Sequence, residues 1–508
     1  MYPGHWSKLK PDAAAVIHAD TGETTTWREL DDRSNRLVNL LLGRGINPGD
    51  HIALLMENHL QFFEISWAAF RSGIYITCIN RYLTAEEAAY IVNDSGAKAV
   101  IASMEVTATA DLATYLENDP LLLLARGALA DWEPLDKALE PYDATPQREQ
   151  LQGDSMLYSS GTTGRPKGIK RPLPDQSVEL GIPGGNSPSP YGIDEQSIYL
   201  SPAPLYHAAP FGFCMRVLSH GGTVVMMPRF DEEKALANIE RFKISHSQWV
   251  PTMFVRMLKL DEAVRSRFDL SSHRCAIHAA APCPVEVKQQ MMAWWGPIIW
   301  EYYAGTERNG LTIIGPRDWL AHPGSVGQAV SGELRICDEQ GQQLPPNQEG
   351  LIYFEQPTRP FEYHNSPEKT AESGHPEHSN WTALGDVGYV DDDGFLFLTD
   401  RKAYLIISGG VNIYPQEIED ALIMHKSVAD VAVFGVPNPE FGEEVKAVVQ
   451  VAAGVSTSDE LAEELKHWAR DHLASFKVPR SFDFMDELPR LPTGKLYKRL
   501  LRDRYWKA

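Results

Sequence analysis

The feature that most constrains the fold is an alternation of helix and strand patterns between residues 24 and 105. The stretch TTTWRELDDRSNRLVNLLLGRG is amphipathic at helical spacing, and Thr26 followed by Glu29 gives it a capping box. HIALLM, LQFFEISWAAFRSG and IYITCI then predict a strand, a helix and a strand. Because such alternation requires crossover connections, it predicts a mostly parallel sheet and an α/β fold.

The rest of the chain changes pattern twice. At 508 residues it is too long for one ordinary core. Short strand patterns with Gly-rich turns over residues 325–400 predict a small β-rich subdomain, and a compact α+β unit follows. We therefore predict two domains, residues 1–400 and residues 401–508. The Pro-, Gly- and Ser-rich stretch 171–192 predicts an exposed loop.

Composition excludes several classes of function. Lys and Arg number 47 against 68 Asp and Glu, and a formal net charge of −21 disfavours binding to nucleic acid or to an anionic membrane surface. No apolar run approaches the roughly 20 residues of a membrane span, so no integral membrane segment is expected. The five cysteines show no paired framework, which predicts a cytoplasmic location.

A Gly-, Ser- and Thr-rich loop is the first candidate site. YSSGTTGRPKGIKR spans residues 158–171, and such turns present backbone N–H groups and hydroxyls to an anion. Its cations are Arg165, Lys167, Lys170 and Arg171. The loop departs from the Walker pattern, because Pro166 precedes Lys167 and Gly168 follows it. On these residues alone a flexible surface turn remains an alternative.

The full stretch S-S-G-T-T-G-x-P-K-G resembles the signature of the adenylate-forming superfamily, which comprises acyl- and aryl-CoA synthetases, peptide-synthetase adenylation domains and beetle luciferases. The resemblance implies two α/β subdomains and a β-rich subdomain within residues 1–400, which bind acid, ATP and Mg²⁺. It implies a mobile C-terminal lid within residues 401–508. The loop would clamp the β- and γ-phosphates of ATP, with Thr162 near the metal. The loop residues with this implied role are Ser159, Ser160, Gly161, Thr162, Thr163, Gly164 and Lys167.

YYAGTE, residues 302–307, is similar to the family's aromatic-G-x-T-E motif, with Ala304 in place of the usual glycine. Tyr302, Tyr303 and Ala304 would line the adenine site, where an aromatic face stacks on a base. Thr306 would contact the α-phosphate. The Glu307 carboxylate would hold Mg²⁺, which prefers oxygen ligands.

HAAAPCP, residues 278–284, stands where the family often has Gly-Gly-Ala-Pro. The resemblance therefore implies that Ala280, Ala281 and Pro282 line the nucleotide and acyl sites. A zinc site is the alternative in this part of the chain, although the spacing of its ligands is irregular. Its four ligands would be His273, Cys275, His278 and Cys283.

Two further motifs flank the predicted domain boundary. In WTALGDVGYVDDDG, Asp386 would accept hydrogen bonds from the ribose hydroxyls, although Leu384 replaces the usual threonine. Calcium binding by the three aspartates of this stretch lacks the other ligands of an EF-hand, so a hairpin turn is the preferred interpretation. In TDRKAYLIISGG, Arg401 would contact ribose and phosphate, and Ala403 replaces the charged pivot common in the family. Gly409 and Gly410 would lie near the pantetheine tunnel.

LPRLPTGKLYKR, residues 488–499, resembles the C-terminal catalytic-lysine motif. Lys495 would bridge the substrate carboxylate and the nucleotide phosphate, two anions whose approach needs a cation between them. The surrounding tail is basic, with Arg490, Lys498, Arg499, Arg502, Arg504 and Lys507 against Asp503. In PLYHAAPF, His207 matches the family position beside the carboxylate end of the acyl pocket; a structural histidine is the alternative.

The resemblance predicts ATP-dependent activation of a carboxylic acid to acyl-AMP with release of pyrophosphate, followed by transfer to CoA. ATP, Mg²⁺ and CoA are implied, together with a small-molecule fatty, aryl or polycyclic acid and a possible homodimer. The nearest alternative passes the acyl group to an amine. Luciferase-like oxygenation, a Walker-type ATPase that releases ADP and a non-catalytic binding module are less favoured.

Overall fold

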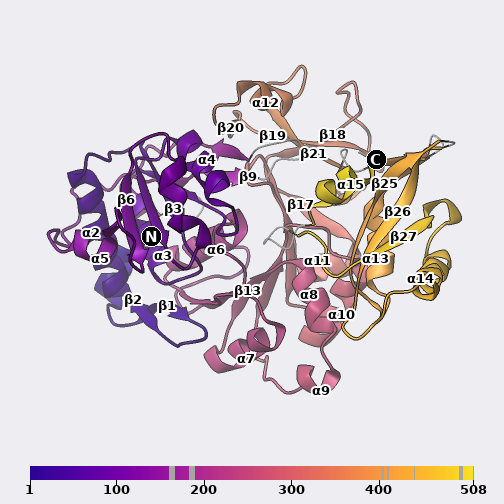
Figure 1. Ribbon diagram of the computed structural model, residues 1–508, viewed down its shortest axis with the longest axis horizontal. Helices are drawn as coiled ribbons and strands as arrows, with labels where there is room; N and C mark the ends of the chain where they lie inside the picture. Colours follow the sequence, from indigo (N-terminus) through magenta and orange to yellow (C-terminus); the bar gives the residue numbers. More distant parts are fainter. Residues whose placement is uncertain are drawn as a thin grey trace. The chain divides into compact units, whose positions relative to one another are not determined.

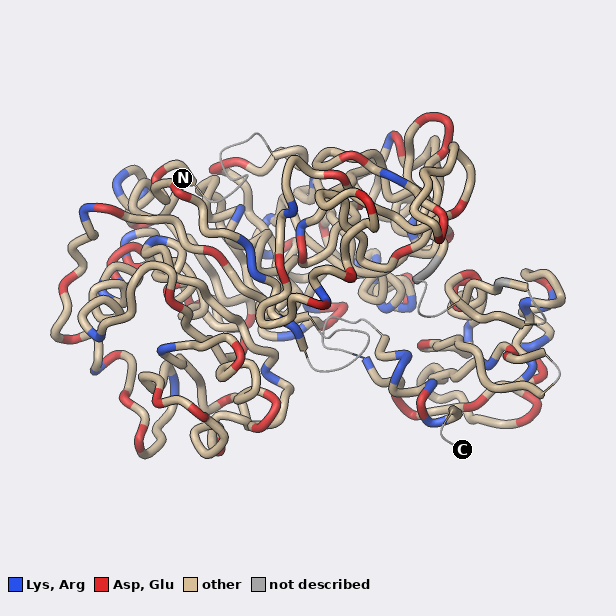
Figure 2. Tube along the Cα trace, turned by 90° about the horizontal axis from the view of Figure 1, so that it is seen from above, with Lys and Arg blue, Asp and Glu red and all other residues tan. Residues whose placement is uncertain are grey.

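The computed structural model describes residues 1–159, 166–181, 189–401, 405–408, 411–439, 441–490 and 496–506. The chain forms two compact units. Unit 1 comprises Met1–His278, Gln289–Arg308 and Pro360–Glu372, and unit 2 comprises Ala279–Lys288, Asn309–Arg359 and Ser373–Ala508. Asp and Glu occur along the described trace of both units, interspersed with Lys and Arg (Figure 2). The boundary between residues 400 and 401 stays a prediction.

The first sheet of unit 1 is parallel throughout, in the order β7-β6-β5-β3-β4-β8 (Figure 1). Helices α3 and α4 make the crossovers from β3 to β4 and from β4 to β5. The strands are β3 (His51–Leu55), β4 (Tyr75–Cys78), β5 (Ala99–Ser103), β6 (Leu121–Arg126), β7 (Glu133–Pro134) and β8 (Asp154–Ser155). The associated helices are α2 (Trp27–Gly43), α3 (Gln61–Phe70), α4 (Ala85–Ser95) and α5 (Leu135–Leu139). The predicted capping box is confirmed, since Thr26 and Glu29 bond reciprocally at the start of α2.

A second sheet of unit 1 follows the order β15-β14-β13-β11-β12-β1-β2, in which only β2 is antiparallel to its neighbour. Its strands are β1 (Ala14–His18), β2 (Thr24–Thr26), β11 (Ile198–Ser201), β12 (Thr223–Met226), β13 (His246–Trp249), β14 (Cys275–His278) and β15 (Ile299–Tyr303). The helices between these strands are α6 (Ala208–Ser219), α7 (Glu232–Phe242), α8 (Pro251–Leu258), α9 (Glu262–Arg265) and α10 (Val285–Trp295).

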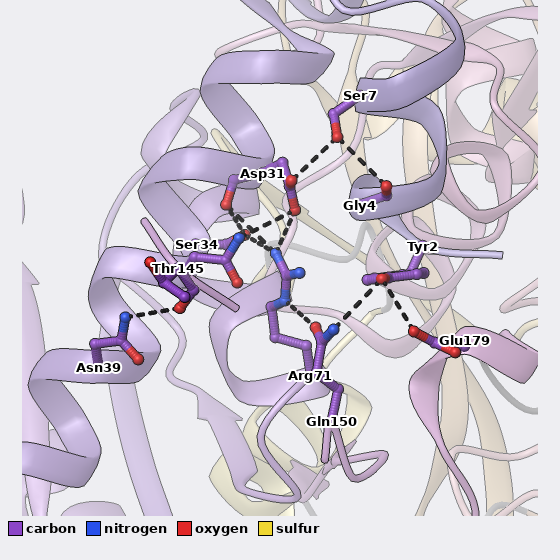
Figure 3. A network of polar contacts seen from close by, with 11 residues as sticks. Tyr2, Gly4, Ser7, Asp31, Ser34, Asn39, Arg71, Thr145, Gln150 and Glu179 are labelled. Atoms are coloured by element: carbon purple, nitrogen blue, oxygen red, sulfur yellow. Dashed lines mark hydrogen bonds and ion pairs between the residues drawn. The ribbon is translucent and has the colours of Figure 1, made fainter. Parts of the chain in front are cut away.

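A buried polar network ties the start of the chain to unit 1 (Figure 3). Arg71, at the end of α3, is 1% exposed and donates to the Asp31 carboxylate at 2.7 Å and to Gln150 Oε1 at 2.8 Å. The Gln150 amide donates to the Tyr2 hydroxyl, and Tyr2 in turn donates to Glu179 Oε1, both at 3.4 Å. Five segments distant in sequence are thereby joined, among them the residue that precedes α1 (Pro3–Leu9).

The loop predicted over residues 171–192 is anchored at both of its described ends. Val178 is fully buried, and residue 177 bridges to residue 151. Tyr191 is 7% exposed, and its ring packs 5.7 Å from Phe213 and 5.6 Å from Trp300. The prediction of an exposed loop is therefore wrong for these residues, because apolar side chains within the Pro- and Gly-rich stretch pack into the core.

Unit 2 contains the antiparallel sheet β18-β19-β21-β22-β17-β16. Its strands are β16 (Leu311–Ile314), β17 (Ser325–Ser331), β18 (Glu333–Cys337), β19 (Gly350–Glu355), β21 (Trp381–Val390) and β22 (Leu396–Arg401), with helix α11 (Pro316–Ala321). The predicted hairpin turn at the three aspartates joins β21 to β22. This region confirms the predicted β-rich subdomain.

The C-terminal part of unit 2 is a five-stranded sheet in the order β24-β23-β26-β25, with β27 paired to β26 (Figure 1). Its strands are β23 (Ile406–Ser408), β24 (Val411–Ile413), β25 (Val428–Asn438), β26 (Gly442–Val451) and β27 (Ser481–Met485). The helices are α13 (Pro415–Ile423), α14 (Asp459–His472) and α15 (Lys498–Trp506).

Alternate residues of β25 and β26 build two cores on the two faces of this sheet, as strand geometry requires. Val431 and Val433 pack with α13 and α14, whereas Ala432 and Phe434 pack with Leu501 of α15. The α/β class, with a small α+β part at the C-terminus, is thus confirmed. Across the described ranges no helix combines the length and the apolar character needed to span a membrane.

Candidate active site

The predicted phosphate loop belongs to a β-hairpin in unit 1. Strand β9 (Leu157–Ser159) pairs with β10 (Lys167–Lys170), so that Ser159 lies opposite Lys167 and Tyr158 opposite Gly168. Strand β20 (Glu362–Tyr363) pairs with the other side of β10. Residues 160–165 lie outside the described residues, so the site predictions for Ser160, Gly161, Thr162, Thr163 and Gly164 are not tested.

The base of this hairpin is fixed to helix α4 and to the chain after β20. The Tyr158 hydroxyl donates to Asp94 Oδ2 at 2.6 Å, and the Tyr90 hydroxyl donates to the Pro166 carbonyl at 3.3 Å. A Cβ atom on Gly168 would lie 3.0 Å from Tyr158 Cζ and 3.2 Å from His364 Cβ. The glycine after Lys167 is therefore explained by close packing at the hairpin base.

Lys167 and Glu307 both contact one tyrosine. The Tyr363 hydroxyl donates to Glu307 Oε1 at 2.8 Å, and the Lys167 ammonium lies 5.4 Å from the centre of the Tyr363 ring. Glu307 is 8% exposed, and Lys167 is half-buried. Burial lowers the pKa of Lys167, with Lys369 acting in the same direction and Glu372 and Glu307 opposing it. Three segments far apart in sequence thus place a cation and a carboxylate on the same aromatic side chain.

Arg171 has a different role from the one predicted. Its guanidinium donates to both carboxylate oxygens of Asp154 at 2.8–3.0 Å, and the two side chains are 11% and 5% exposed. Its Nη1 also donates to the Thr306 carbonyl at 3.4 Å. The interpretation of Arg171 as a phosphate-binding cation is corrected: it is a buried structural cation that links the hairpin to the segment of Thr306.

The YYAGTE segment lies where β15 ends. Tyr302 and Tyr303 are the last residues of the strand, and Ala304, Thr306 and Glu307 follow directly. The carboxyl end of a parallel strand is the usual place for a ligand in an α/β sheet. The Tyr302 ring packs 5.7 Å from that of Phe213 on α6. Thr306 and Glu307 are therefore held by Arg171 and Tyr363, at the end of the sheet where a nucleotide is expected.

His207 occupies the N-cap position of α6 and is a neutral histidine. Burial lowers its pKa to about 3, and its ring centre lies 4.1 Å from that of Tyr206. Neither His207 Nε2 nor the Tyr206 hydroxyl, both buried, has a hydrogen-bond partner among the described residues. An unsatisfied buried polar atom costs about 1–3 kcal/mol, so both atoms are candidates to meet a polar group of a ligand.

The remaining residues that the sequence predicts to bind the nucleotide belong to unit 2. Asp386, 7% exposed, lies on β21 directly opposite Arg401 on β22. The pairing of the two strands therefore brings together two residues to which the sequence assigned a ribose contact; the Arg401 side chain lies outside the described part. Ala280 precedes Ala281 and Pro282 and has a φ of +78°. This left-handed backbone favours glycine, the residue common there in the family.

Three further catalytic or binding predictions, for Gly409, Gly410 and Lys495, fall outside the described residues. The same holds for the hinge residue Ala403.

The histidines of the zinc alternative have other partners in unit 1. His273 Nε2 lies 2.6 Å from Ser247 Oγ, and His278 Nε2 lies 3.4 Å from Glu301 Oε2. Across the described ranges, the group whose ligand atoms lie close enough for a metal ion is His322, Asp391 and Asp393, within 4.8 Å of one another. The Asp391 carboxylate there accepts the backbone N–H groups of Asp393 and Phe395 of the hairpin turn.

Sequence reasoning missed the residues that connect the motifs. Tyr363 links Lys167 to Glu307, Asp154 holds Arg171, and Asp94 holds Tyr158. None of them lies within a recognisable motif. The sequence contains one indirect indication of them. The motifs contain several charged and hydroxyl side chains, which need hydrogen-bond or ion-pair partners from elsewhere in the chain.

Comparisons with known proteins agree with this geometry. The chain matches the AMP-binding enzyme family over residues 5–359 and the AMP-binding enzyme C-terminal domain over residues 417–495. A feruloyl-CoA synthase of Amycolatopsis sp is 33% identical over 508 residues, 99% of this chain and 98% of that protein. The fatty acid–[acyl-carrier-protein] ligase ScoC of Streptomyces coeruleorubidus is 31% identical over 506 residues, 98% and 94% of the two chains.

Among solved structures, the amide bond synthetase McbA from Marinactinospora thermotolerans superposes with a TM-score of 0.82 at 26% identity, covering 99% of each chain. The match of the family over most of the chain, together with relatives of full length, establishes the assignment: the chain belongs to the AMP-binding enzyme family.

Proposed function

We propose that the protein is an AMP-forming acid–thiol ligase, which activates a carboxylic acid with ATP and transfers the acyl group to CoA. The observation that carries the proposal is the joint contact of Lys167 and Glu307 with Tyr363. A cation at the base of a hydroxyl-rich hairpin beside a buried carboxylate is an arrangement suited to a nucleotide triphosphate and its metal ion.

The residues present fit Mg²⁺. Glu307 offers a carboxylate oxygen, the ligand type that this ion prefers, and Tyr363 fixes its orientation through one hydrogen bond. Thr162 is the second residue assigned to the metal, from the part of the hairpin outside the described residues. When bound, the ion supplies positive charge that neutralises the phosphate oxygens.

In the first half-reaction a substrate carboxylate oxygen attacks the α-phosphorus, and the bond to the bridging oxygen of pyrophosphate breaks. The hairpin and Lys167 hold the departing β- and γ-phosphates, while Thr306 contacts the α-phosphate. Lys495 is the cation that we assign to stabilise the negative charge that develops as the two anions approach. Asp386 and Arg401 orient the ribose. His207, neutral at physiological pH, packs at the carboxylate end of the acid and does not act as a base.

In the second half-reaction the sulfur of CoA attacks the acyl carbon of the acyl-AMP. The carbon–oxygen bond to the phosphate breaks, AMP leaves, and the thiol proton passes to solvent. The C-terminal part rotates between the two steps, which withdraws Lys495 and brings Gly409 and Gly410 to the thiol tunnel. The similarity to a feruloyl-CoA synthase supports CoA as the acceptor. The similarity to a fatty acid–[acyl-carrier-protein] ligase supports a carrier-protein thiol as a second possible acceptor. The structural similarity to an amide bond synthetase supports the alternative, in which an amine accepts the acyl group.

The acid is bulky, either an aryl acid or a fatty acid. A Cβ atom on Gly212 of α6 would meet no atom within 4 Å, so there is open space beside this helix. The next residue of α6, Phe213, packs 5.7 Å from the Tyr302 ring. Relatives that act on ferulic acid and on fatty acids support the same two classes.

The experiment is a pyrophosphate-release assay with ATP and a panel of aryl and fatty acids, followed by product analysis with CoA, a carrier-protein thiol or an amine present. We expect acid-dependent pyrophosphate release and an acyl-CoA product. Release of ADP and phosphate without any acid would contradict the proposal in favour of a Walker-type ATPase. An amide formed in preference to a thioester would establish the alternative acceptor.

A further inference from the structure

The segment that carries Lys495 is closed at its base by backbone contacts. Residues 490 and 496 form an antiparallel bridge, and the Tyr497 N–H donates to the Pro489 carbonyl at 2.8 Å. Residues 491–495 lie between these contacts and outside the described residues. Arg490 and Leu496 are therefore the last described residues on either side of Lys495.

The N-terminal side of this base is held by Arg490. Its Nε and Nη2 donate to the two carboxylate oxygens of Asp430 on β25, a two-pronged ion pair. Two residues earlier, the Leu488 N–H donates to Gln450 Oε1 at 3.1 Å. Asp430 and Gln450 face each other across β25 and β26. The chain is therefore attached to a single cross-strand pair as it enters the lysine segment.

The C-terminal side is held by Lys498, the first residue of α15. Its ammonium lies 2.8 Å from Glu419 Oε1 on α13, and the two side chains are 9% and 10% exposed. The same oxygen accepts the Val433 N–H of β25 at 2.6 Å. This contact lies at the end of the sheet order, because β25 pairs with β26 alone among the described strands.

Both ends of the segment are thus fixed to one strand, three residues apart at Asp430 and Val433. The sequence had grouped Arg490 and Lys498 with the basic residues around Lys495. The structure instead gives each of them an acid from a distant part of the chain. Both cations are neutralised by ion pairs inside the C-terminal part. They therefore do not compete with Lys495 for an anionic ligand.

We propose that Arg490 and Lys498 are positioning residues, which together with Asp430 and Glu419 set where Lys495 stands in the adenylation step. The inference rests on the proposed function, since it concerns the half-reaction assigned to Lys495. Ion pairs with fixed geometry hold a segment more specifically than apolar packing does, and a misplacement of about 1 Å can cost about 10²-fold in rate.

The test compares the half-reactions of the full-length variants R490M and K498M. Acid-dependent pyrophosphate release measures adenylation, and thioester formation from supplied acyl-AMP and CoA measures the second step. We expect adenylation to fall by about 10- to 100-fold with the KM for ATP little changed, and the second step by less than about threefold. R490K, which keeps the charge but not the two-pronged geometry, should give an intermediate loss.

Two further variants separate position from stability. Leu465→Ala removes a fully buried side chain of α14 from the opposite core, so it lowers the melting temperature without touching the base of the segment. It should leave the ratio of the two half-reactions unchanged. The double variant E419Q/K498M removes both buried charges; it should recover melting temperature relative to K498M while adenylation stays low.

Equal losses in both half-reactions of K498M and R490M would overturn the inference. Adenylation that returns with the melting temperature in E419Q/K498M would also overturn it, because the pair would then act only through stability. Lys495→Ala separates this result from a failure of the proposed function. If that variant loses adenylation selectively while K498M and R490M do not, only the positioning role is wrong. If Lys495→Ala lowers both steps equally, the assignment of Lys495 itself is wrong.

Discussion

The β9–β10 hairpin of unit 1 and the base of the Lys495 segment in unit 2 both flank a stretch of predicted ligand-binding residues. The contacts that stabilise the two regions differ. In each region the described residues flank a stretch that lies outside the described part, residues 160–165 in the first and 491–495 in the second. The hairpin base is held by pairing of β9, β10 and β20 and by tyrosine hydroxyls that donate to Asp94 and Glu307. The lysine base is held by two ion pairs that reach β25.

The difference indicates what each region must do. A hairpin built into a sheet stays in one place, which suits a phosphate and metal site. A single cation that serves one step needs an exact position within the C-terminal part, for which we propose a rotation, and charged pairs inside that part would supply this position. Damage to the first region should therefore affect nucleotide handling in general, whereas damage to the second should be selective for one half-reaction.

The largest expected effect is on the ion pair below the hairpin. Asp154→Ala leaves the Arg171 guanidinium buried without its carboxylate, so the free energy of unfolding should fall by about 3–5 kcal/mol. Both half-reactions should decline together, because Arg171 also holds the Thr306 carbonyl. Urea denaturation and the two half-reaction assays measure this. A loss of adenylation without a loss of thioester formation would contradict the proposed difference between the two regions.

Glu307→Gln should lower adenylation by about 10²–10³-fold, the range found when one preorganised charge-stabilising group is removed. Tyr363→Phe is the matched control, since it removes only the hydrogen bond that orients Glu307. A hydrogen bond to a charged carboxylate is worth about 1.5–3 kcal/mol, or about 10- to 150-fold. Steady-state pyrophosphate release at saturating acid measures both. If the phenylalanine variant lost as much as the glutamine variant, Glu307 would act through its position alone.

The stability of the region at the base of the Lys495 segment should depend on pH through Asp420, which follows Glu419 on α13. Burial raises the pKa of Asp420 to about 7, with Glu419 and Glu417 acting in the same direction and Gln416 and Lys498 opposing it. The folded chain therefore keeps a proton that the unfolded chain releases above about pH 4. Stability should fall as pH rises from about 4 to 7 and level off above that.

Asp420→Asn removes this penalty. It should raise the melting temperature at pH 8 and have little effect near pH 4, as differential scanning calorimetry can measure. A variant that is less stable than the natural chain at pH 8 would show that the Asp420 charge supports Lys498 and does not oppose burial.

The smallest expected effect is on the free energy of unfolding at Ala280, where the relevant energy is backbone strain and not an ion pair. Its left-handed backbone costs about 1–2 kcal/mol for an L residue. Glycine removes that cost but gains about 0.5–1 kcal/mol of unfolded-chain freedom. Ala280→Gly should therefore stabilise the protein by less than about 1.5 kcal/mol, while Ala280→Val destabilises it. Chemical denaturation of the two variants measures the difference, and a destabilised glycine variant would refute the strain argument.

Local patterns of the sequence predicted much of the fold. The capping box at Thr26 and the strand–helix alternation depend on neighbours in the chain, and both are found in the structure. The small C-terminal α+β part was predicted on the same basis, since its strand and helix patterns are short-range.

The candidate site was predictable only as separate motifs. The contact of Tyr363 with Glu307 joins residues 56 positions apart, and the pair of Lys498 with Glu419 joins a tail to a helix. Strand pairing set such contacts, as it did for Asp386 and Arg401, and no local pattern encodes which strands become neighbours. For the same reason the motif shows Arg171 only as one of the loop's cations, because its partner Asp154 precedes the motif and carries no signature.

The central claim is that Lys495 serves adenylation and not thioester formation. The most direct measurement is the ratio of the two half-reactions in Lys495→Ala, with pyrophosphate release from ATP and acid for the first and thioester formation from supplied acyl-AMP and CoA for the second. We predict a loss of at least about 10²-fold in the first and less than about threefold in the second. An equal loss in both half-reactions would contradict the account.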